Sequence, residues 1–247
     1  SWPHGRTRGD RDGGRHASRT LVRMSDHAPA DPRPPSEDLR IRRVSERAGY
    51  DRETIHRIVD AALIAHVGTI RDGKPLVIPM LAVRDGEWLL LHGAHASGSV
   101  RRGRGQQVCV EMTLLDGLVL ARSAFHHSLN YRSVVILGEA EVISDEAERA
   151  QALEIFMERL LPGRQEQLRP TTQAEVKQTA VLRISLEHAS TKVRTGPPGD
   201  EEEDYGWPVW AGVLPVTTHV GQPEPDPRLQ PGVDLPQHVR DLADTDR

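Results

Sequence analysis

The segment at residues 92–104 combines serines, glycines and arginines in a pattern that could bind a phosphate group. Ser97 and Ser99 offer hydroxyl donors, while Arg101 and Arg102 offer guanidinium groups that contact phosphate oxygens in pairs. The small residues between them let a ligand approach the backbone closely. Taken alone, a solvated basic loop is an equally good interpretation. The segment is not a Walker loop, because the Gly-Lys-Ser/Thr ending is missing.

A second segment, residues 115–135, holds side chains of metal-binding and nucleophilic types. His126 and His127 are adjacent, so on a strand they would point to opposite faces and form a poor pair of metal ligands. Ser123, a histidine and Asp116 have the composition of a hydrolase triad, but no nucleophile-elbow motif supports that reading. We therefore predict no metal site and assign no catalytic residue.

Composition narrows the class of protein. The chain of 247 residues is 37% apolar, which allows one well-cored domain with tails or two small domains. Its net charge of -4 provides no field that would attract nucleic acid or an anionic membrane. The N-terminal arginines lack the apolar core of a secretory signal, so we expect a cytoplasmic protein that binds neither nucleic acid nor membrane. Cys109 is the sole cysteine, and its valine neighbours predict a small buried side chain.

The two ends of the chain differ from its middle. Residues 1–40 are rich in Arg, Asp, Gly and Pro and are predicted to form a disordered N-terminal tail, with Met24 inside it as a candidate start. Interspersed aspartates favour a solvated tail over an RNA-binding arm. Residues 221–247 are predicted to form a flexible C-terminal tail, which leaves residues 41–220 as the folded domain.

The middle region has the pattern of short strands with few helices. Asp51 is a candidate N-cap for an amphipathic helix ending near His66, and a second helix is expected over residues 146–161. Asp-Gly pairs predict hairpin turns, including one that would separate strands 108–114 and 118–122. This spacing predicts an antiparallel barrel. The other expected strands are residues 67–70, 75–83, 88–92, 131–143 and 180–186.

Several motifs, in order over about residues 43–214, resemble the pyridoxamine 5′-phosphate oxidase-like family of FMN-binding split barrels. The resemblance is greatest to its bacterial flavin-nucleotide-binding branch, which is related to nitroimidazole-resistance proteins. The matching stretches are residues 49–52, 66–68, 72–79, 91–94, 114–123, 128–134, 194–198 and 208–215.

This resemblance implies a mainly β, antiparallel split β-barrel with a few flanking helices, acting as a homodimer with FMN at the interface. A strand would lie along the isoalloxazine, the loop would hold the phosphate, and a later segment would approach the flavin across the dimer. The residues implied, in that order, are Val77, Ile78, Pro79 and Met80; Ser97, Ser99, Arg101 and Arg102; and Tyr131, Arg132 and Ser133, with His92 near the ring.

Some of these residues have structural alternatives. Arg132 could be an ion-pair partner, Tyr131 a residue of the barrel rim, and His92 a hydrogen-bonded histidine at a strand end. Trp207 and Trp210 are expected to seal the barrel or the dimer interface.

The sequence lacks the C-terminal Arg-and-His segment of authentic pyridoxamine 5′-phosphate oxidases, so oxidation of vitamin B6 is not expected. The first functional hypothesis is an FMN-dependent oxidoreductase that takes electrons from NAD(P)H and acts on an unknown small molecule. The alternatives are a non-catalytic flavin-binding module for sensing or storage, and a split barrel that uses deazaflavin or haem. In the haem alternative the candidate iron ligands are His92, His126 and His127.

Overall fold

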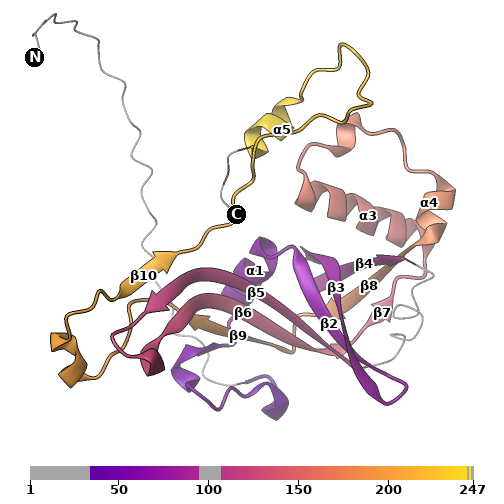
Figure 1. Cartoon of the computed structure of the whole chain (residues 1–247). Helices are drawn as coiled ribbons and strands as arrows, with labels where there is room; N and C mark the ends of the chain where they lie inside the picture. The colour runs from indigo at the N-terminus through magenta and orange to yellow at the C-terminus, as the bar shows by residue number, and fades with distance from the viewer. Residues whose placement is uncertain (1–33, 95–106, 244, 246–247) are drawn as a thin grey trace, which may run out of the picture.

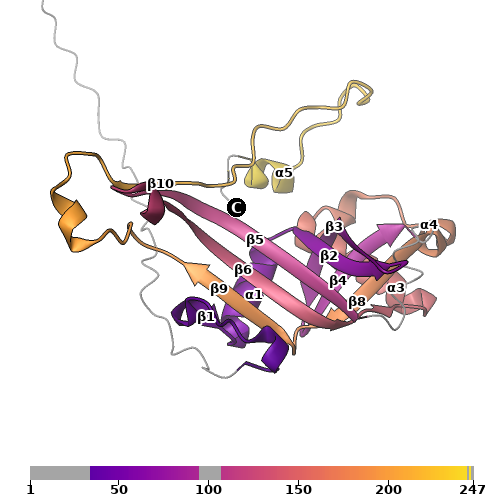
Figure 2. The ribbon, with the colours of Figure 1, turned by 60° about the horizontal axis from the view of Figure 1, so that its bottom comes forward.

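The computed structural model describes residues 34–94, 107–243 and 245. These residues form one antiparallel sheet of ten strands that curves around a core, with few helices (Figures 1 and 2). The strand order is β1-β9-β6-β5-β2-β3-β4-β8-β7, and β10 pairs with β5. The strands are β1 (Ala48–Gly49), β2 (Ile64–Arg71), β3 (Lys74–Asp85), β4 (Trp88–Ala94), β5 (Gln107–Leu120), β6 (Ser128–Glu139), β7 (Glu141–Val142), β8 (Thr179–Ser185), β9 (Ala189–Arg194) and β10 (Gly212–Pro215).

The β2–β3 hairpin confirms the turn predicted at Asp72-Gly73. Arg71 pairs with Lys74, so the loop has two residues, and both have positive φ, 51° and 72°. Two residues in this conformation match the right-handed twist of the paired strands. The turn between β3 and β4 begins at Gly86, which also has positive φ, as the second Asp-Gly pair predicted.

Asp116-Gly117 does not form the predicted turn. Residues 107–120 are one strand, β5, which pairs with β6 along its length and has only a bulge between Leu115 and Gly117. The sequence prediction of two strands is therefore wrong. Gly117 is required for a different reason, because a Cβ there would meet Val213 Cγ1 at 2.9 Å and the Leu214 carbonyl oxygen at 3.1 Å on β10.

Helix α1 (Arg52–Ala61) covers the inner face of the sheet. The Asp51 side chain accepts a hydrogen bond from Thr54 N at 2.8 Å, which confirms the predicted N-cap. Ile55, Ile58 and Val59 are buried in the main core cluster, and the helix lies against β3, β5, β6 and β9. The helix ends at Ala61, earlier than predicted, and His66 lies on β2.

Two further helices lie against β3, β4 and β8 on the other side of the molecule from β10 (Figure 1). The longer, α3 (Glu146–Leu160), has Asp145 as its N-cap and confirms the predicted second helix. Its Phe156 is buried with Val83 and Val181. The shorter, α4 (Gln173–Gln178), begins with a capping box of Thr172 and Glu175.

The structure also differs from the sequence predictions near the domain boundaries. Glu37–Leu39 form a 3-10 turn with Leu39 buried, so packed structure begins before residue 41. The C-terminal segment includes a short helix, α5 (Gln237–Leu242), and β9 was not predicted at all. Of the helices in the described residues, none combines the length and apolar character that a membrane crossing requires.

Candidate functional site

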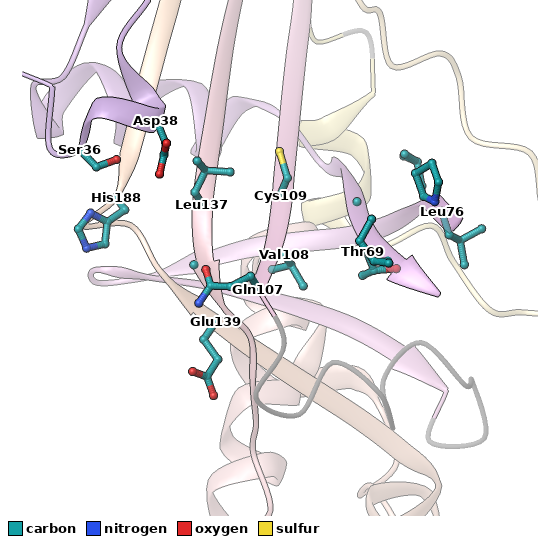
Figure 3. A pocket seen from close by; sticks show the side chains of 15 residues that line it. Ser36, Asp38, Thr69, Leu76, Gln107, Val108, Cys109, Leu137, Glu139 and His188 are labelled. Carbon is teal, nitrogen blue, oxygen red and sulfur yellow. The ribbon is translucent and has the colours of Figure 1, made fainter. Parts of the chain in front are cut away.

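One candidate site is a cavity of about 720 Å³ on the outer face of the sheet, here called the outer-face cavity. It lies where β2, β3, β5 and β6 run next to one another, and Gln107 in its wall follows the 95–106 segment directly. Figure 3 shows Leu137 and Cys109 in the middle, with Ser36, Asp38 and His188 on one side, Thr69 and Leu76 on the other, and Gln107 and Glu139 below. The cavity thus has apolar walls with hydrogen-bonding groups at its edges.

The strand register explains the floor of this cavity. Val77 pairs with Gly68, Gly68 with Cys109, and Cys109 with Leu137, so these four residues form one row across four strands. Cross-strand partners share a face of the sheet. Gly68 has no side chain, so no atoms rise above the backbone at the centre of this row. A Cβ at this position would lie 3.2 Å from the Cys109 carbonyl oxygen. A flat ring could therefore approach the backbone at this point.

A polar group lies in the next rows of the same face. His66 Nδ1 is 3.4 Å from Glu111 Oε2, and the Thr113 hydroxyl donates a hydrogen bond to Glu111 Oε1. His66 pairs with both Pro79 and Glu111 across its neighbouring strands. An acid and an imidazole thus lie close to the apolar cavity and could contact a ligand that extends beyond it.

The residues predicted to contact the flavin ring are only partly brought together. Val77 lines the outer-face cavity and is 61% exposed. Pro79 lies on the same face because it alternates with Val77 along β3, whereas Ile78 and Met80 point to the opposite face. Met80 packs against the main core cluster.

The three predicted residues of β6 also divide between the faces. Tyr131 and Ser133 alternate with Leu137 and share its face, farther along the strand, and Ser133 Oγ donates to the Lys192 carbonyl oxygen at 3.3 Å. Arg132 points the other way and forms a bidentate ion pair with Asp116. The alternative interpretation, in which Arg132 is an ion-pair partner, thus has direct support.

His92 lies in a different cavity of about 440 Å³, here called the α3 cavity. Its ring makes an edge contact with Phe156 of α3, with centroids 5.6 Å apart and planes at 74°. The remaining wall is mainly apolar and includes Leu153, Met157 and Leu168, with Arg169 also at the cavity. The structure thus separates His92 from the residues that line the outer-face cavity.

The predicted phosphate-binding residues lie outside the described residues. These are Ser97, Ser99, Arg101 and Arg102. Within the described ranges, no group of three or more His, Cys, Asp or Glu side chains could hold a metal ion.

The prediction that Cys109 is buried is wrong. Cys109 is exposed, because it alternates with Val108 and Val110, which point into the core. His126 ends a 3-10 turn, Ala124–His126, between the strands, and both His126 and His127 line a single cavity. Trp207 and Trp210 are 67% and 62% exposed, so they do not seal the sheet within this chain.

Most residues of the outer-face cavity were not predicted from the sequence. Strict alternation along β5 could have shown that Cys109, Glu111 and Thr113 share one face, because Val108, Val110 and Met112 supply the apolar side. No local pattern identifies His188, which reaches the cavity only because β9 pairs with β6.

Comparison with known proteins identifies the family of this chain. Residues 51–193 match the sequence model of the pyridoxamine 5′-phosphate oxidase family. The chain is 44% identical to the flavocytochrome Anf3 of Azotobacter vinelandii, over 86% of this chain and 99% of that one, with a TM-score of 0.83. It is 35% identical to the FAD- and haem-binding protein of Mycobacterium smegmatis, over 80% of this chain and 98% of that one, with a TM-score of 0.76. Among curated proteins no match was found.

The family model covers more than half of the chain, and both solved structures match it along nearly their whole length. Their TM-scores of 0.83 and 0.76 show that they share the fold described above. On this evidence the chain belongs to the pyridoxamine 5′-phosphate oxidase-like family of flavin-binding proteins.

Proposed function

We propose that this protein is a flavin-dependent oxidoreductase with its flavin in the outer-face cavity. The observation that carries the proposal is the row Val77, Gly68, Cys109 and Leu137, which offers a low, flat floor about as wide as four strands. A planar isoalloxazine favours apolar walls, and its polar edge needs a few hydrogen-bonding groups. Thr69, Gln107 and His188 supply such groups at the edge of the cavity.

The residues present therefore fit a flavin. When bound, the flavin supplies the electron transfer, while the chain binds it, orients it and excludes water from one face of the ring. The proposed phosphate ligands remain those implied by the family resemblance, Ser97, Ser99, Arg101 and Arg102. They lie outside the described residues, in the part of the sequence that precedes Gln107 of the cavity wall. FMN was the cofactor expected from the sequence, and the relative that binds FAD supports a flavin nucleotide of either kind.

A second cofactor, haem, is supported by one observation in this chain. The α3 cavity presents the His92 imidazole within a mainly apolar wall, and no hydrogen bond to that ring occurs among the described residues. Histidine is the common axial ligand of haem iron, and an apolar surround suits the macrocycle. Both relatives named above carry haem or cytochrome in their descriptions. We propose His92 as the ligand in preference to His126 and His127, whose cavity is polar.

We also propose that the chain forms a homodimeric split barrel through the outer face. Ile64 and Ile70 of β2 are 56% and 60% exposed on that face, and Leu115 of β5 is 42% exposed. Exposed apolar side chains on one sheet face commonly mark a protein interface. A second copy packed there would close the outer-face cavity from above and remove the flavin from water.

The competing function is a module that binds flavin without turnover, because no acid–base pair has been assigned at the ring. One experiment separates the possibilities. The purified protein is examined by absorbance, its cofactors are released and identified by chromatography, and reduction by NADH or NADPH is followed without oxygen.

Flavin bands that bleach with NADH or NADPH support the oxidoreductase, while stable flavin bands support the binding module. A Soret band alongside them supports haem. Protein that is colourless and ignores added FMN and FAD contradicts the flavin proposal, and deazaflavin then becomes the next ligand to test.

A further inference from the structure

Another cavity, of about 540 Å³ and with mainly polar walls, lies at the opposite end of β6 from the outer-face cavity. We call it the β6–β9 cavity, because it forms where β6 begins and β9 ends. The residues that line it come from three separate parts of the chain. They are Arg47, Phe125, His126, His127, Ser128, Val193, Arg194, Thr195, Pro197 and Gly199.

Arg194 brings a buried positive charge to this cavity. The residue is 92% buried, since only 8% of its surface is exposed. Its guanidinium donates to Asn130 Oδ1 and to the carbonyl oxygens of Gly196 and Pro197, at 3.4 and 3.2 Å. Its Nε has no partner. All its acceptors among the described residues are neutral, so no carboxylate there compensates the charge. An uncompensated buried charge is costly.

Arg47 adds a second positive charge instead of relieving the first. It lines the same cavity, and no hydrogen bond or ion pair of its side chain occurs within the described ranges. Burial and the nearby charge of Arg47 both lower the pKa of Arg194. No Asp or Glu is among the residues that line the cavity. Two arginines that face one cavity without an acid are the arrangement that an anion would stabilise.

Each of the two histidines in this cavity has one ring nitrogen beside an oxygen atom. His127 Nδ1 lies 2.8 Å from the Ser123 carbonyl oxygen, which fixes Nδ1 as the protonated nitrogen when the ring is neutral. His126 Nε2 lies 3.5 Å from Glu201 Oε1, so the Glu201 carboxylate already has a neighbouring imidazole.

Phe125 gives the cavity an aromatic wall. Its ring is 89% exposed and is held by an edge contact with His126, with centroids 5.1 Å apart and planes at 88°. An exposed aromatic ring stacks with a planar base of any sequence, which contributes about 1–3 kcal/mol per base in other proteins. The cavity therefore offers both the positive charges of Arg47 and Arg194 and the flat apolar surface of Phe125.

We propose that the β6–β9 cavity is a nucleotide-binding site separate from the flavin site, with the phosphate held by Arg47 and Arg194 and the base stacked on Phe125. The proposal does not depend on the flavin proposal, because it uses none of the same residues.

The test is calorimetric titration of the purified full-length protein with AMP, inorganic phosphate and adenosine, in the presence of saturating FAD. We expect AMP to bind most tightly. Arg47→Gln should weaken AMP binding by about tenfold or more, the usual effect of losing a charged hydrogen-bonding partner. Phe125→Ala should weaken AMP binding and leave phosphate binding unchanged. Arg159→Gln is the matched control, since this exposed arginine lies on α3, away from the cavity.

Three results would overturn the proposal. The first is equal AMP affinity in the wild type and in Arg47→Gln. The second is adenosine that binds as tightly as AMP, because the phosphate would then contribute nothing. The third is loss of AMP binding when FAD is added, which would make the cavity part of the flavin site. Arg47→Gln is preferred to a change at Arg194, whose hydrogen bonds to Asn130 and Pro197 support the fold.

Discussion

The guanidinium of Arg132 bridges the β5 bulge to β6 by donating two hydrogen bonds to the carboxylate of Asp116. Nε lies 2.9 Å from Oδ2 and Nη2 lies 2.7 Å from Oδ1. Both side chains are more than two-thirds buried, so water screens the pair only partly. The bulge that a sequence reader interprets as a turn is thus tied to the neighbouring strand by its own aspartate.

Arg132→Leu should therefore lower the free energy of unfolding by about 1–2 kcal/mol, because Asp116 loses its bidentate partner while remaining partly buried. Urea denaturation measures the change. A double-mutant cycle with Asp116→Ala isolates the pair, and we expect the two substitutions to be clearly non-additive. Unchanged stability together with a loss of flavin would instead assign Arg132 to the cofactor site.

Asp200 should make the segment after β9 sensitive to acid. Burial raises the pKa of Asp200, but hydrogen bonds from the Arg122 backbone and guanidinium, both 2.9 Å, outweigh it and leave that pKa below its ordinary value. A folded-state pKa below the unfolded value gives stability that is present above the ordinary pKa and is lost as pH falls through the folded one. Limited proteolysis should therefore cut residues 195–211 faster below about pH 4.

Asp200→Asn should cut equally fast at neutral and acid pH, because the titrating group is gone. Glu202→Gln is the control in the same segment, since Glu202 is exposed. A wild-type cleavage rate that does not change with pH would show that this ion pair does not hold the segment.

Gly68→Val should displace the flavin. The added side chain rises from the floor of the outer-face cavity, and its Cβ would lie 3.2 Å from the Cys109 carbonyl oxygen. Overpacking of this kind costs about 1–3 kcal/mol, so flavin affinity should fall roughly tenfold to hundredfold. Fluorescence titration with FMN and FAD measures it. Cys109→Ser, which keeps the volume of the same cavity, should bind flavin normally, and normal binding by Gly68→Val would place the ring elsewhere.

His92→Ala should remove the Soret band and leave the flavin bands in place, because the α3 cavity and the outer-face cavity share none of their lining residues. The pyridine haemochrome assay quantifies the haem. His127→Ala is the matched control. Haem lost from His127→Ala but kept by His92→Ala would move the site to the β6–β9 cavity and contradict both proposals made for these cavities.

Ile64→Glu should convert the proposed dimer to monomer without unfolding the chain, since Ile64 is already 56% exposed. An unpaired charge buried in an interface costs several kcal/mol, so the dissociation constant should rise roughly hundredfold or more. Sedimentation velocity measures the mass. Leu229→Glu, at an exposed apolar residue of the C-terminal segment, should leave the dimer intact. A stable dimer in Ile64→Glu would show that the subunits meet on another surface.

Features set by adjacent residues could be predicted from the sequence. The Asp72-Gly73 hairpin follows from the conformational freedom of its two residues, and α3 follows from the cap at Asp145 and its apolar spacing. Features set by distant pairing could not. Asp116-Gly117 has the same composition as a hairpin turn, but here it lies in a strand that pairs with β6 and β10 and is tied to Arg132.

The same distinction explains the candidate site. Val77 was identified because its motif resembles the family. His188 and Thr69 come to line the same cavity only through the pairing of several strands. Cys109 was misassigned because its valine neighbours suggest a buried run, although on a strand they point to the other face.

The long pairing of β5 with β6, which is interrupted by one bulge, separates the two proposed ligand sites. Leu137 lines the outer-face cavity and Ser128 lines the β6–β9 cavity on the same strand, which at about 3.4 Å per residue places them roughly 30 Å apart along it. Hydride transfer needs reacting atoms within about 3.5 Å. A nucleotide in the β6–β9 cavity is therefore too distant to reduce the flavin of its own chain. If the flavin lies in the outer-face cavity as proposed, a nicotinamide that reduces it would have to enter that cavity from solvent or across the proposed dimer interface.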